Sequence, residues 1–284
     1  MANYENVAWF GGSYSPPTKM HVRVAIEIGK TLLKNTSPGK QCCVAIVPVS
    51  GKYKKGSVRD ECISQADRWA LANAFVEAIQ ADIVHELESR ASDLHYKLLD
   101  YEFTAGRAVP TIESLEILKS QPFCTPETNI YIAQGQDNIM AIMARKWTKS
   151  DELLSKYSFF MFPRGDSSVK NVTLQMIQTL ITKIPEQRYM AVSIDEAFHI
   201  VKKVEFVGEG FSDDTSSSKV RKLIQDSKGV QHAQLEHLLH PHVLETLQHL
   251  NPAVYIDESC EKTPAAGGSR RVTQKFRRRH ISLE

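Results

Sequence analysis

The chain has 284 residues, of which 42% are apolar and 24% charged, the composition of an ordinary globular protein. No apolar run reaches the roughly 18 residues that a membrane-spanning helix needs, so no membrane protein is predicted. The net charge is +2, but residues 269–284 alone carry +5, which leaves the rest of the chain at −3. The body is therefore mildly acidic and predicts no dedicated nucleic-acid-binding face.

The five cysteines indicate a reducing compartment. None stands in a CxxC pair, and Cys42 and Cys43 are adjacent in an apolar segment typical of a strand. Neighbouring strand residues face opposite sides of a sheet, so we expect two small core side chains rather than metal ligands. Because free thiols are typical of the cytosol and nucleus, and Met1–Asn6 shows no secretory signal, we expect a cytoplasmic protein.

Short apolar segments alternate with amphipathic ones along most of the chain. This alternation predicts an α/β fold, namely a Rossmann-like, doubly wound parallel sheet with helices on both faces. The predicted strands are 7–10, 42–49, 129–133, 157–162, 189–194 and 201–204. The predicted helices are 21–33, 64–78, 112–118, 138–143, 174–184, 217–225 and 235–249, the last split or kinked at His240-Pro241. The segment 85–110 fits neither pattern clearly.

The end of the chain differs in composition from the rest. The helical pattern stops after Asn251-Pro252, and residues 263–269 are rich in Gly, Ala, Ser and Pro, as flexible linkers are. We therefore predict one domain over 1–258 and a flexible basic tail over 259–284. The tail is expected to be a nuclear signal, a contact with an anionic surface or disordered chain, and the sequence leaves these open.

The most informative segment, Gly11–His21, joins the first predicted strand to the first predicted helix. Its glycines let backbone N–H groups approach an anion closely, and the start of the helix adds partial positive charge. Thr18 and His21 are one helical turn apart, so they face one site, where a ring donor stabilises phosphate charge. The segment predicts a phosphate site, although it is neither a GxGxxG fingerprint nor a Walker loop.

The motif Gly12–His21 resembles Gly-Ser-Phe-Asn-Pro-x-Thr-x-Met-His of the eukaryotic nicotinamide mononucleotide (NMN) adenylyltransferases. These enzymes belong to the nucleotidyltransferase superfamily that has the TxxH or HxGH signature. Four further parts of the chain resemble the family in the same order, from residue 7 to about 255. They are the lysine block 48–56, Gly135-Gln136-Asp137, Trp147 with Arg164, and the serine motif 215–221.

The resemblance implies an enzyme that transfers the adenylyl group of ATP to NMN, to nicotinate mononucleotide or to both, and releases pyrophosphate. A phosphate monoester is already largely ionised near pH 7, so its attack on the α-phosphorus needs no general base. Catalysis is then expected from positioning and charge neutralisation. Mg²⁺ is expected to bind mainly through the ATP phosphates, without a metal site on the protein.

The resemblance also implies a role for particular residues. A helix start rich in serine binds phosphate, an arginine one turn later forks two phosphate oxygens, and a tryptophan is large enough to stack on a pyridine ring. The residues expected to be catalytic are Thr18, His21 and Arg221. Those expected to bind ATP are Gly12, Ser13, Tyr14, His21, Gly135, Asp137, Ser217, Ser218, Lys219 and Arg221. Those expected to bind the mononucleotide are Ser13, Lys55, Leu87, Trp147 and Arg164.

Several alternatives stay open. Departures from the family pattern at Leu87 and Lys146 lie toward the pyridine end, so the choice between NMN and nicotinate mononucleotide is undecided. A sister nucleotidyltransferase of the pantetheine-phosphate or cytidylyl type is disfavoured by the Lys54-Lys55-Gly56 block. A non-catalytic nucleotide- or RNA-binding module on the same fold is supported mainly by the basic tail. A homo-oligomer is also left open by the sequence.

Overall fold

The fold is built on one parallel β-sheet. The computed structural model describes residues 3–49, 64–83, 90–163, 168–182, 192–208, 215–227 and 233–250. Within these residues six strands pair in the order β3-β2-β1-β4-β5-β6, all in parallel. They are β1 (Tyr4–Gly12), β2 (Gln41–Pro48), β3 (Leu94–Leu98), β4 (Asn129–Gly135), β5 (Ser158–Phe162) and β6 (Val204–Phe206). This strand order is that of a doubly wound Rossmann-like sheet and confirms the predicted fold class.

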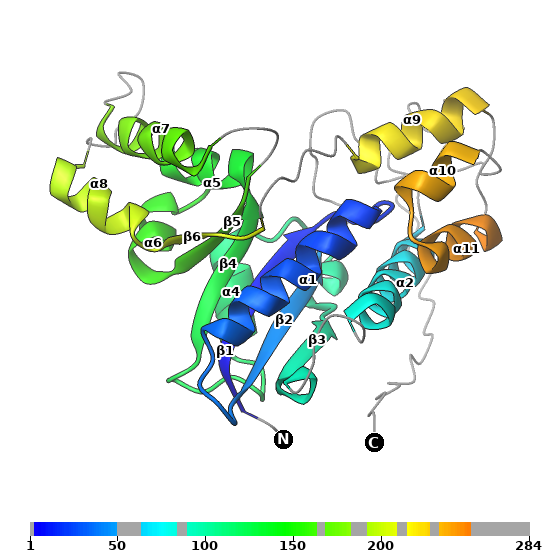
Figure 1. Ribbon diagram of the computed structural model, residues 1–284, viewed down its shortest axis with the longest axis horizontal. Coiled ribbons are helices and arrows are strands. Elements are labelled where there is room, and N and C mark those ends of the chain that lie inside the picture. The colour runs from blue at the N-terminus through cyan, green and yellow to red at the C-terminus, as the bar shows by residue number, and fades with distance from the viewer. Residues whose placement is uncertain are drawn as a thin grey trace.

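Helices cover both faces of the sheet (Figure 1). One face packs against α1 (Lys19–Lys34) and α2 (Gln65–Ile83). The other packs against α4 (Thr111–Lys119), α5 (Gln136–Met143), α6 (Ser150–Lys156), α7 (Val169–Ile181) and α8 (Ile194–Val201). Two short helical turns flank β3, namely η2 (Ala91–Asp93) and α3 (Tyr101–Thr104).

The adjacent pair Cys42 and Cys43 shows that both faces are buried. Cys42 belongs to the core beneath α1, whereas Cys43 belongs to the core on the other side. Both side chains are inaccessible to solvent, and burial raises the pKa of the Cys42 thiol to about 11. The prediction that they are small core side chains on opposite faces is confirmed.

A third, smaller core joins the end of the described chain to α2. It lies between α2 and three later helices, α9 (Ser217–Ser227), α10 (Ala233–Leu238) and α11 (Pro241–His249). These helices gather beside α2 in Figure 1. The predicted break at His240-Pro241 is confirmed, because Pro241 opens α11 and His240 is its N-cap. α9 is thus held by this third core and not by the two cores on the faces of the sheet.

The predicted strand 201–204 is displaced, and residues 192–194 of the predicted strand 189–194 are not strand, while 189–191 lie outside the described residues. Ile194 opens α8 instead of ending a strand, and Val201 closes α8, so that β6 begins only at Val204. Ser193 caps this helix by accepting a hydrogen bond from the backbone N–H of Glu196, 3.1 Å away. The apolar residues of α8 recur with helical spacing, but the segment is short enough to resemble two strands. The undecided segment 85–110 contains β3 and α3.

Two further observations concern the end of the chain and the length of the helices. The predicted boundary at residue 258 and the basic tail lie outside the described residues. None of the helices in the described part of the chain combines the length and the apolar character that a membrane crossing requires.

Candidate active site

The predicted phosphate turn lies where the sheet reverses its winding. β1 ends at Gly12 and its neighbour β4 ends at Gly135. The chain continues from β1 into α1 on one face and from β4 into α5 on the other. Such a switch point leaves a crevice at the carboxyl ends of the strands, where ligands of open α/β sheets bind. Gly12–His21 and Gly135–Asp137 thus lie on the two sides of this switch point.

The two glycines of the turn are required by packing. A Cβ on Gly11 would lie 2.3 Å from the Trp9 ring, and a Cβ on Gly12 would lie 2.9 Å from Cζ of Tyr14. Neither glycine has a positive φ, so backbone freedom is not the reason for them. Aromatic rings on both faces of the sheet press against this turn, and only glycine leaves them room.

Tyr14 supports the site from beneath. Its φ is 47°, and only 2% of the residue is exposed. Its hydroxyl donates to the carbonyl oxygen of Phe10, 2.7 Å away, and its ring packs edge-on against His21 at 5.9 Å between centroids. The Tyr14 phenol is thus engaged in the core, and the predicted contact of Tyr14 with ATP stays a prediction.

Thr18 and His21 form one unit at the start of α1. The Thr18 backbone N–H lies 3.1 Å from Nδ1 of His21, and the Thr18 hydroxyl lies 2.7 Å from the same nitrogen. An N–H can only donate, so Nδ1 is the acceptor and the neutral ring carries its proton on Nε2. The capping contact therefore sets the tautomer and makes Nε2 the donor nitrogen of His21. Thr18 is buried and His21 is half-buried.

The start of α9 docks onto the same loop. The Ser217 hydroxyl donates to the carbonyl oxygen of Pro16 at 2.9 Å, and Nη1 of Arg221 donates to that of Ser15 at 2.5 Å. Nη2 of Arg221 also donates to the hydroxyl of Ser218 at 3.0 Å. Two helix N-termini, each with a partial positive charge, therefore meet at one loop. The predicted residues of the serine motif and of the first motif are brought together although about 200 positions separate them.

The serines at the start of α9 differ in their contacts and in their exposure. Ser216 caps the helix, since its hydroxyl accepts a hydrogen bond from the backbone N–H of Lys219 at 3.2 Å. Ser218 and Lys219 are exposed, whereas Ser217 and Arg221 are half-buried. Ser216 is therefore the capping serine of α9, and the exposed pair Ser218 and Lys219 is in a position to meet a ligand.

β4 contributes a residue that the sequence did not single out. Gln134 is buried, and its Nε2 donates to the carbonyl oxygen of Gly11 at 2.9 Å. Its Oε1 accepts from the Asn138 side chain at 2.6 Å. This amide ties the first turn of α5 to the phosphate turn. The signal was visible as a polar residue within an otherwise apolar strand. Asp137 is exposed on the first turn of α5.

Trp147 lies on the loop between α5 and α6. It is half-buried and packs against the core beneath α5. The Ser150 hydroxyl, which donates to its carbonyl oxygen at 2.8 Å, closes the loop. Core packing and stacking on a ligand are compatible at this position, so the stacking role stays a prediction.

Three predicted contacts with the mononucleotide, Lys55, Leu87 and Arg164, lie outside the described residues. The strand order nevertheless bears on the choice of Leu87. β3 ends at Leu98, so the chain that leaves it at the carboxyl edge of the sheet is 99–110. Leu87, by contrast, precedes β3 in the chain.

Segment 99–110 and helix α2 each bring a buried charged residue near the site. Glu102 is 2% exposed, and its Oε1 makes no hydrogen bond. Burial raises the pKa of this carboxyl to about 7, against a smaller opposing effect of the Ser114 hydroxyl. Arg68 of α2 is 3% exposed. A charged residue between apolar helix positions was the signal that could have revealed Arg68.

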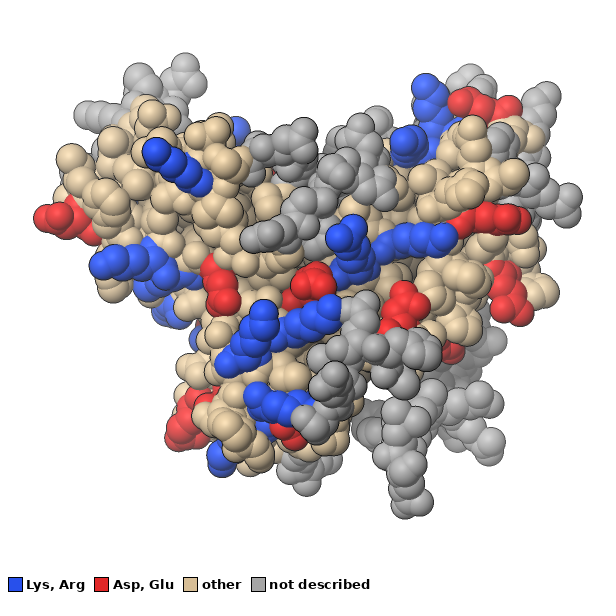
Figure 2. Space-filling model, viewed as in Figure 1, with Lys and Arg blue, Asp and Glu red and all other residues tan. Residues whose placement is uncertain are grey.

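Basic side chains line the outer surface of α1. The helix carries Lys19, Arg23, Lys30 and Lys34 against a single acidic residue, Glu27. Figure 2 shows a row of Lys and Arg side chains along the position of α1. Nζ of Lys19 donates to the carbonyl oxygen of Glu236 at 2.7 Å and so links α1 to α10. Lys19 and Arg23, on the first turns of α1, therefore add positive potential near the site.

The donors at the site are suited to phosphate. Among the residues that the structure describes, no group of three or more His, Cys, Asp and Glu side chains could hold a metal ion. The polar groups around Gly12–His21 and the start of α9 are instead hydroxyls, an imidazole and a guanidinium. The sheet order and the paired helix N-termini together define a doubly wound α/β protein with groups suited to an anion at its switch point.

Comparison with known proteins adds a sequence relative. No family model matches the chain. A protein of Helicobacter pylori named "Probable nicotinate-nucleotide adenylyltransferase" is 28% identical over 162 residues, which cover 57% of this chain and 76% of the relative. The chain is thus similar to a nicotinate-nucleotide adenylyltransferase, in agreement with the resemblance of its motifs.

Two solved structures also align with the chain. Both are of Plasmodium falciparum nicotinic acid mononucleotide adenylyltransferase, one complexed with NaAD and one with APC. They cover 85% of this chain and 94% of their own, with 18% and 19% identity and a TM-score of 0.48. At this level of similarity they carry no argument about the chain, whose fold class follows from its own sheet order.

Proposed function

We propose that the protein is a nucleotidyltransferase that joins the adenylyl group of ATP to NMN, to nicotinate mononucleotide or to both. The observation that carries the proposal is the meeting of two helix N-termini, with His21 on one and Arg221 on the other, at the switch point of the sheet. The name of the Helicobacter pylori relative supports the choice of a pyridine mononucleotide as acceptor.

The reaction needs three phosphate contacts, and the site offers a group for each. A phosphate oxygen of the mononucleotide attacks the α-phosphorus of ATP, and the bond to the β-phosphate breaks as pyrophosphate leaves. The Gly12–Ser13 backbone and Lys55 hold the attacking phosphate, while Nε2 of His21 donates to the α-phosphate. The start of α9, with Arg221, holds the β- and γ-phosphates. Catalysis then comes from positioning and charge stabilisation.

Mg²⁺ enters this proposal as part of the substrate. Mg²⁺ keeps its waters and binds readily to triphosphate oxygens, so it needs no cluster of protein carboxylates. Its chemistry is to neutralise the charge of the leaving pyrophosphate. The residues named above act on the phosphates directly.

Product formation tests the proposal. The full-length protein is incubated with ATP, Mg²⁺ and either NMN or nicotinate mononucleotide, and pyrophosphate and the dinucleotide are both measured. We expect product with at least one acceptor, and phosphopantetheine and CTP with a phosphorylated alcohol serve as controls for the sister enzymes. Absence of product with every acceptor, together with retained ATP binding, would favour a non-catalytic nucleotide-binding module.

The stacking role of Trp147 is tested separately. Trp147→Ala is expected to raise KM for the mononucleotide about fivefold, because a stacked aromatic pair contributes about 1 kcal/mol, and to leave KM for ATP unchanged. Trp147→Phe, which keeps a ring at the same place, is the matched control. Equal weakening of both substrates in Trp147→Ala would refute the role.

The domain boundary and the tail complete the proposal. We expect a chain truncated after residue 258 to keep its activity, because the residues assigned to the site all precede that position. Buried thiols at Cys42 and Cys43 fit a cytoplasmic protein. Fusion of residues 259–284 to a fluorescent protein tests the tail as a nuclear signal. Sedimentation of the full-length protein tests for a homo-oligomer.

A further inference from the structure

Arg68 joins the two chain segments that leave the middle of the sheet toward the site. Its Nη2 donates to the carbonyl oxygen of Val49 at 2.7 Å and to that of Ser13 at 3.4 Å. Val49 follows β2 and Ser13 follows β1, so one guanidinium contacts both exits. The backbone N–H of Val49 also donates to the carbonyl oxygen of Gly12 at 3.0 Å, which ties the same two segments directly.

α2 carries Arg68, and it also packs against the residues around His21 at the start of α1. The Arg68 guanidinium carbon lies 5.2 Å from the ring centroid of Phe103, a cation–π contact. About two turns further along α2, Phe75 packs against Tyr14 at 4.9 Å and edge-on against His21 at 6.4 Å. α2 thus supports both halves of the phosphate turn.

A buried arginine at this place needs a reason. Taking a guanidinium out of water is costly, and well-packed apolar residues often replace buried ionic groups without loss of stability. A hydrogen bond from a charged donor is strong and directional, and the planar guanidinium fixes the direction better than a lysine does. Its charge is also felt strongly in a poorly polarisable interior, directly beneath the turn assigned to the attacking phosphate.

We propose that Arg68 is a positioning residue for adenylyl transfer. It fixes the Gly12–Ser13 turn against the end of β2, so that the backbone N–H groups of the turn meet the incoming phosphate in one orientation. Arg68 acts through the turn and does not contact the substrate. This inference rests on the proposed function.

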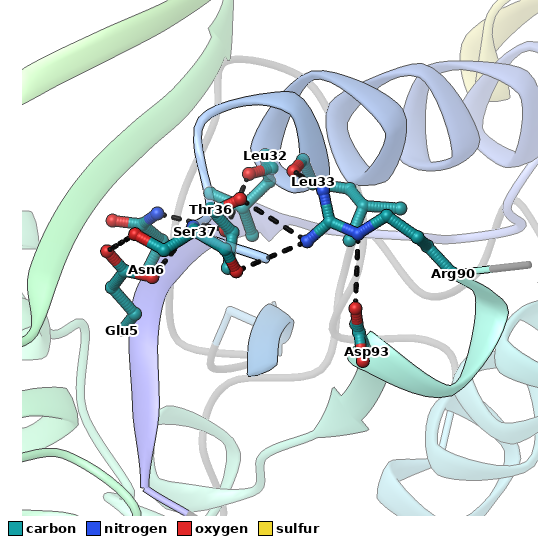
Figure 3. A network of polar contacts seen from close by, with 8 residues as sticks. All are labelled: Glu5, Asn6, Leu32, Leu33, Thr36, Ser37, Arg90 and Asp93. Atoms are coloured by element: carbon teal, nitrogen blue, oxygen red, sulfur yellow. Dashed lines mark hydrogen bonds and ion pairs between the residues drawn. The ribbon is translucent and has the colours of Figure 1, made fainter. Parts of the chain in front are cut away.

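The chain offers a matched control at the opposite edge of the sheet. Nη1 of Arg90 donates to the carbonyl oxygen of Leu33 at 3.1 Å, and its Nη2 donates to that of Thr36 at 3.3 Å (Figure 3). Arg68 and Arg90 thus both donate hydrogen bonds to backbone carbonyl oxygens, but of the two only Arg68 does so next to the candidate site. A purely structural role predicts the same phenotype for the loss of either.

The experiment compares Arg68→Met, Arg68→Lys and Arg90→Met in the full-length protein. Melting temperature, kcat, KM for both substrates and backbone hydrogen exchange are measured for each. For Arg68→Met we expect kcat to fall about 100-fold, as small displacements of a positioned group do, with KM for ATP unchanged. Arg68→Lys keeps the charge and is expected to recover only part of kcat. Arg90→Met is expected to melt earlier and to keep its kcat.

Hydrogen exchange separates this inference from the proposed function, because it needs no turnover. The Arg68 variants are expected to exchange faster at 11–14 and 47–49, and Arg90→Met at 33–37. If the wild-type protein forms no dinucleotide, the proposed function fails while the exchange data still test whether Arg68 fixes the turn. A kcat near the wild-type value in Arg68→Met, or unchanged exchange at 11–14, overturns the inference. If Arg68→Met does not fold, the same two readings on Arg68→Lys decide.

Discussion

The two ends of α1 differ in how their unpaired backbone groups are satisfied and in what surrounds them. Every helix leaves backbone groups without partners inside the helix, N–H groups at its start and carbonyls at its end. At the start of α1 the capping partner is Thr18 with His21, and the loop before it meets the start of α9. At the end of α1 the protein itself supplies partners for the last carbonyls (Figure 3). The first end is the one that the proposed function assigns to the phosphates, and we call it the open end; the second, where backbone and side chains are tied together, is the closed end.

The closed end is a dense network of hydrogen bonds. Arg90 donates to Leu33 and Thr36 and pairs with Asp93 through its Nε at 3.1 Å. Asn6 donates to the carbonyl oxygen of Asn35 and to the Thr36 hydroxyl, both at 2.9 Å. These contacts bind β1, the end of α1 and the start of β3 together at the amino edge of the sheet. They satisfy buried and half-buried polar groups, which stabilises this edge.

The open end retains polar atoms that the protein does not satisfy. Oγ of Ser15 and Oε1 of Glu102 are buried and make no hydrogen bond. Buried polar groups are almost always satisfied in native proteins, and exceptions need an explanation. Four buried side-chain atoms of the described residues make no hydrogen bond: three, on Ser15, Glu102 and Arg68, lie toward the carboxyl edge, and the fourth, Nε2 of His95, lies in β3. The comparison teaches that the functional edge bears more of this cost in stability than the amino edge does.

The largest effect is expected from the open end. We predict that His21→Ala lowers kcat by about 10²–10³-fold with a smaller change in KM, because a preorganised donor to the reacting phosphate is lost. Steady-state kinetics with ATP and the accepted mononucleotide measure it. His199→Ala, on the exposed side of α8, is the control. A kcat close to the wild-type value would remove His21 from the mechanism.

The pH dependence of the free energy of unfolding tests whether burial of Glu102 destabilises the protein. Burial raises its pKa from 4.5 to about 7, so the folded protein binds more protons than the unfolded one between these values. The free energy of unfolding must then fall as pH rises through this window, by about 3 kcal/mol in total. Glu102→Gln removes the titration, so the variant gains stability over the wild type as pH increases from 4.5 to 8.

Chemical denaturation at a series of pH values measures this difference, and Glu127→Gln, at an exposed loop position, is the control. Parallel stability curves for the wild type and Glu102→Gln would show that Glu102 is not buried at a cost.

Asn6 tests the closed end. It is 1% exposed, and it also accepts a hydrogen bond from the Asn129 side chain at 2.9 Å. Asn6→Ala leaves its buried partners unsatisfied, and we expect a loss of about 2 kcal/mol in the free energy of unfolding. At temperatures where the variant is folded, kcat is expected to equal that of the wild type. A selective loss of kcat would contradict the division between the two ends.

The smallest effect is expected at Ser15. Its buried hydroxyl has no partner, so Ser15→Ala should raise the free energy of unfolding by about 1 kcal/mol. Thr36→Val is the matched change at the closed end, where the hydroxyl donates to the Leu32 carbonyl at 2.8 Å, and it is expected to destabilise. Urea denaturation compares them, and effects of the same sign would refute the comparison.

Local features of the chain were predictable because neighbouring residues determine them. The alternation of apolar segments predicted the parallel sheet, Cys42 and Cys43 predicted two buried faces, and His240-Pro241 predicted the break before α11. The short helix α8 escaped prediction because its apolar spacing is too brief to distinguish a helix from strands. β3 escaped because an edge strand with polar residues lacks a continuous apolar run.

By itself the sequence determined the sheet, the phosphate turn and the residue types of the site, since strand burial, capping and helix starts depend on residues within a few positions of each other. Only the tertiary structure decided that α9 docks on the loop before α1, that Gln134 and Arg68 hold the phosphate turn, and that the two ends of α1 differ. Those contacts join residues tens to hundreds of positions apart, and their geometry depends on how the packed helices and strands meet.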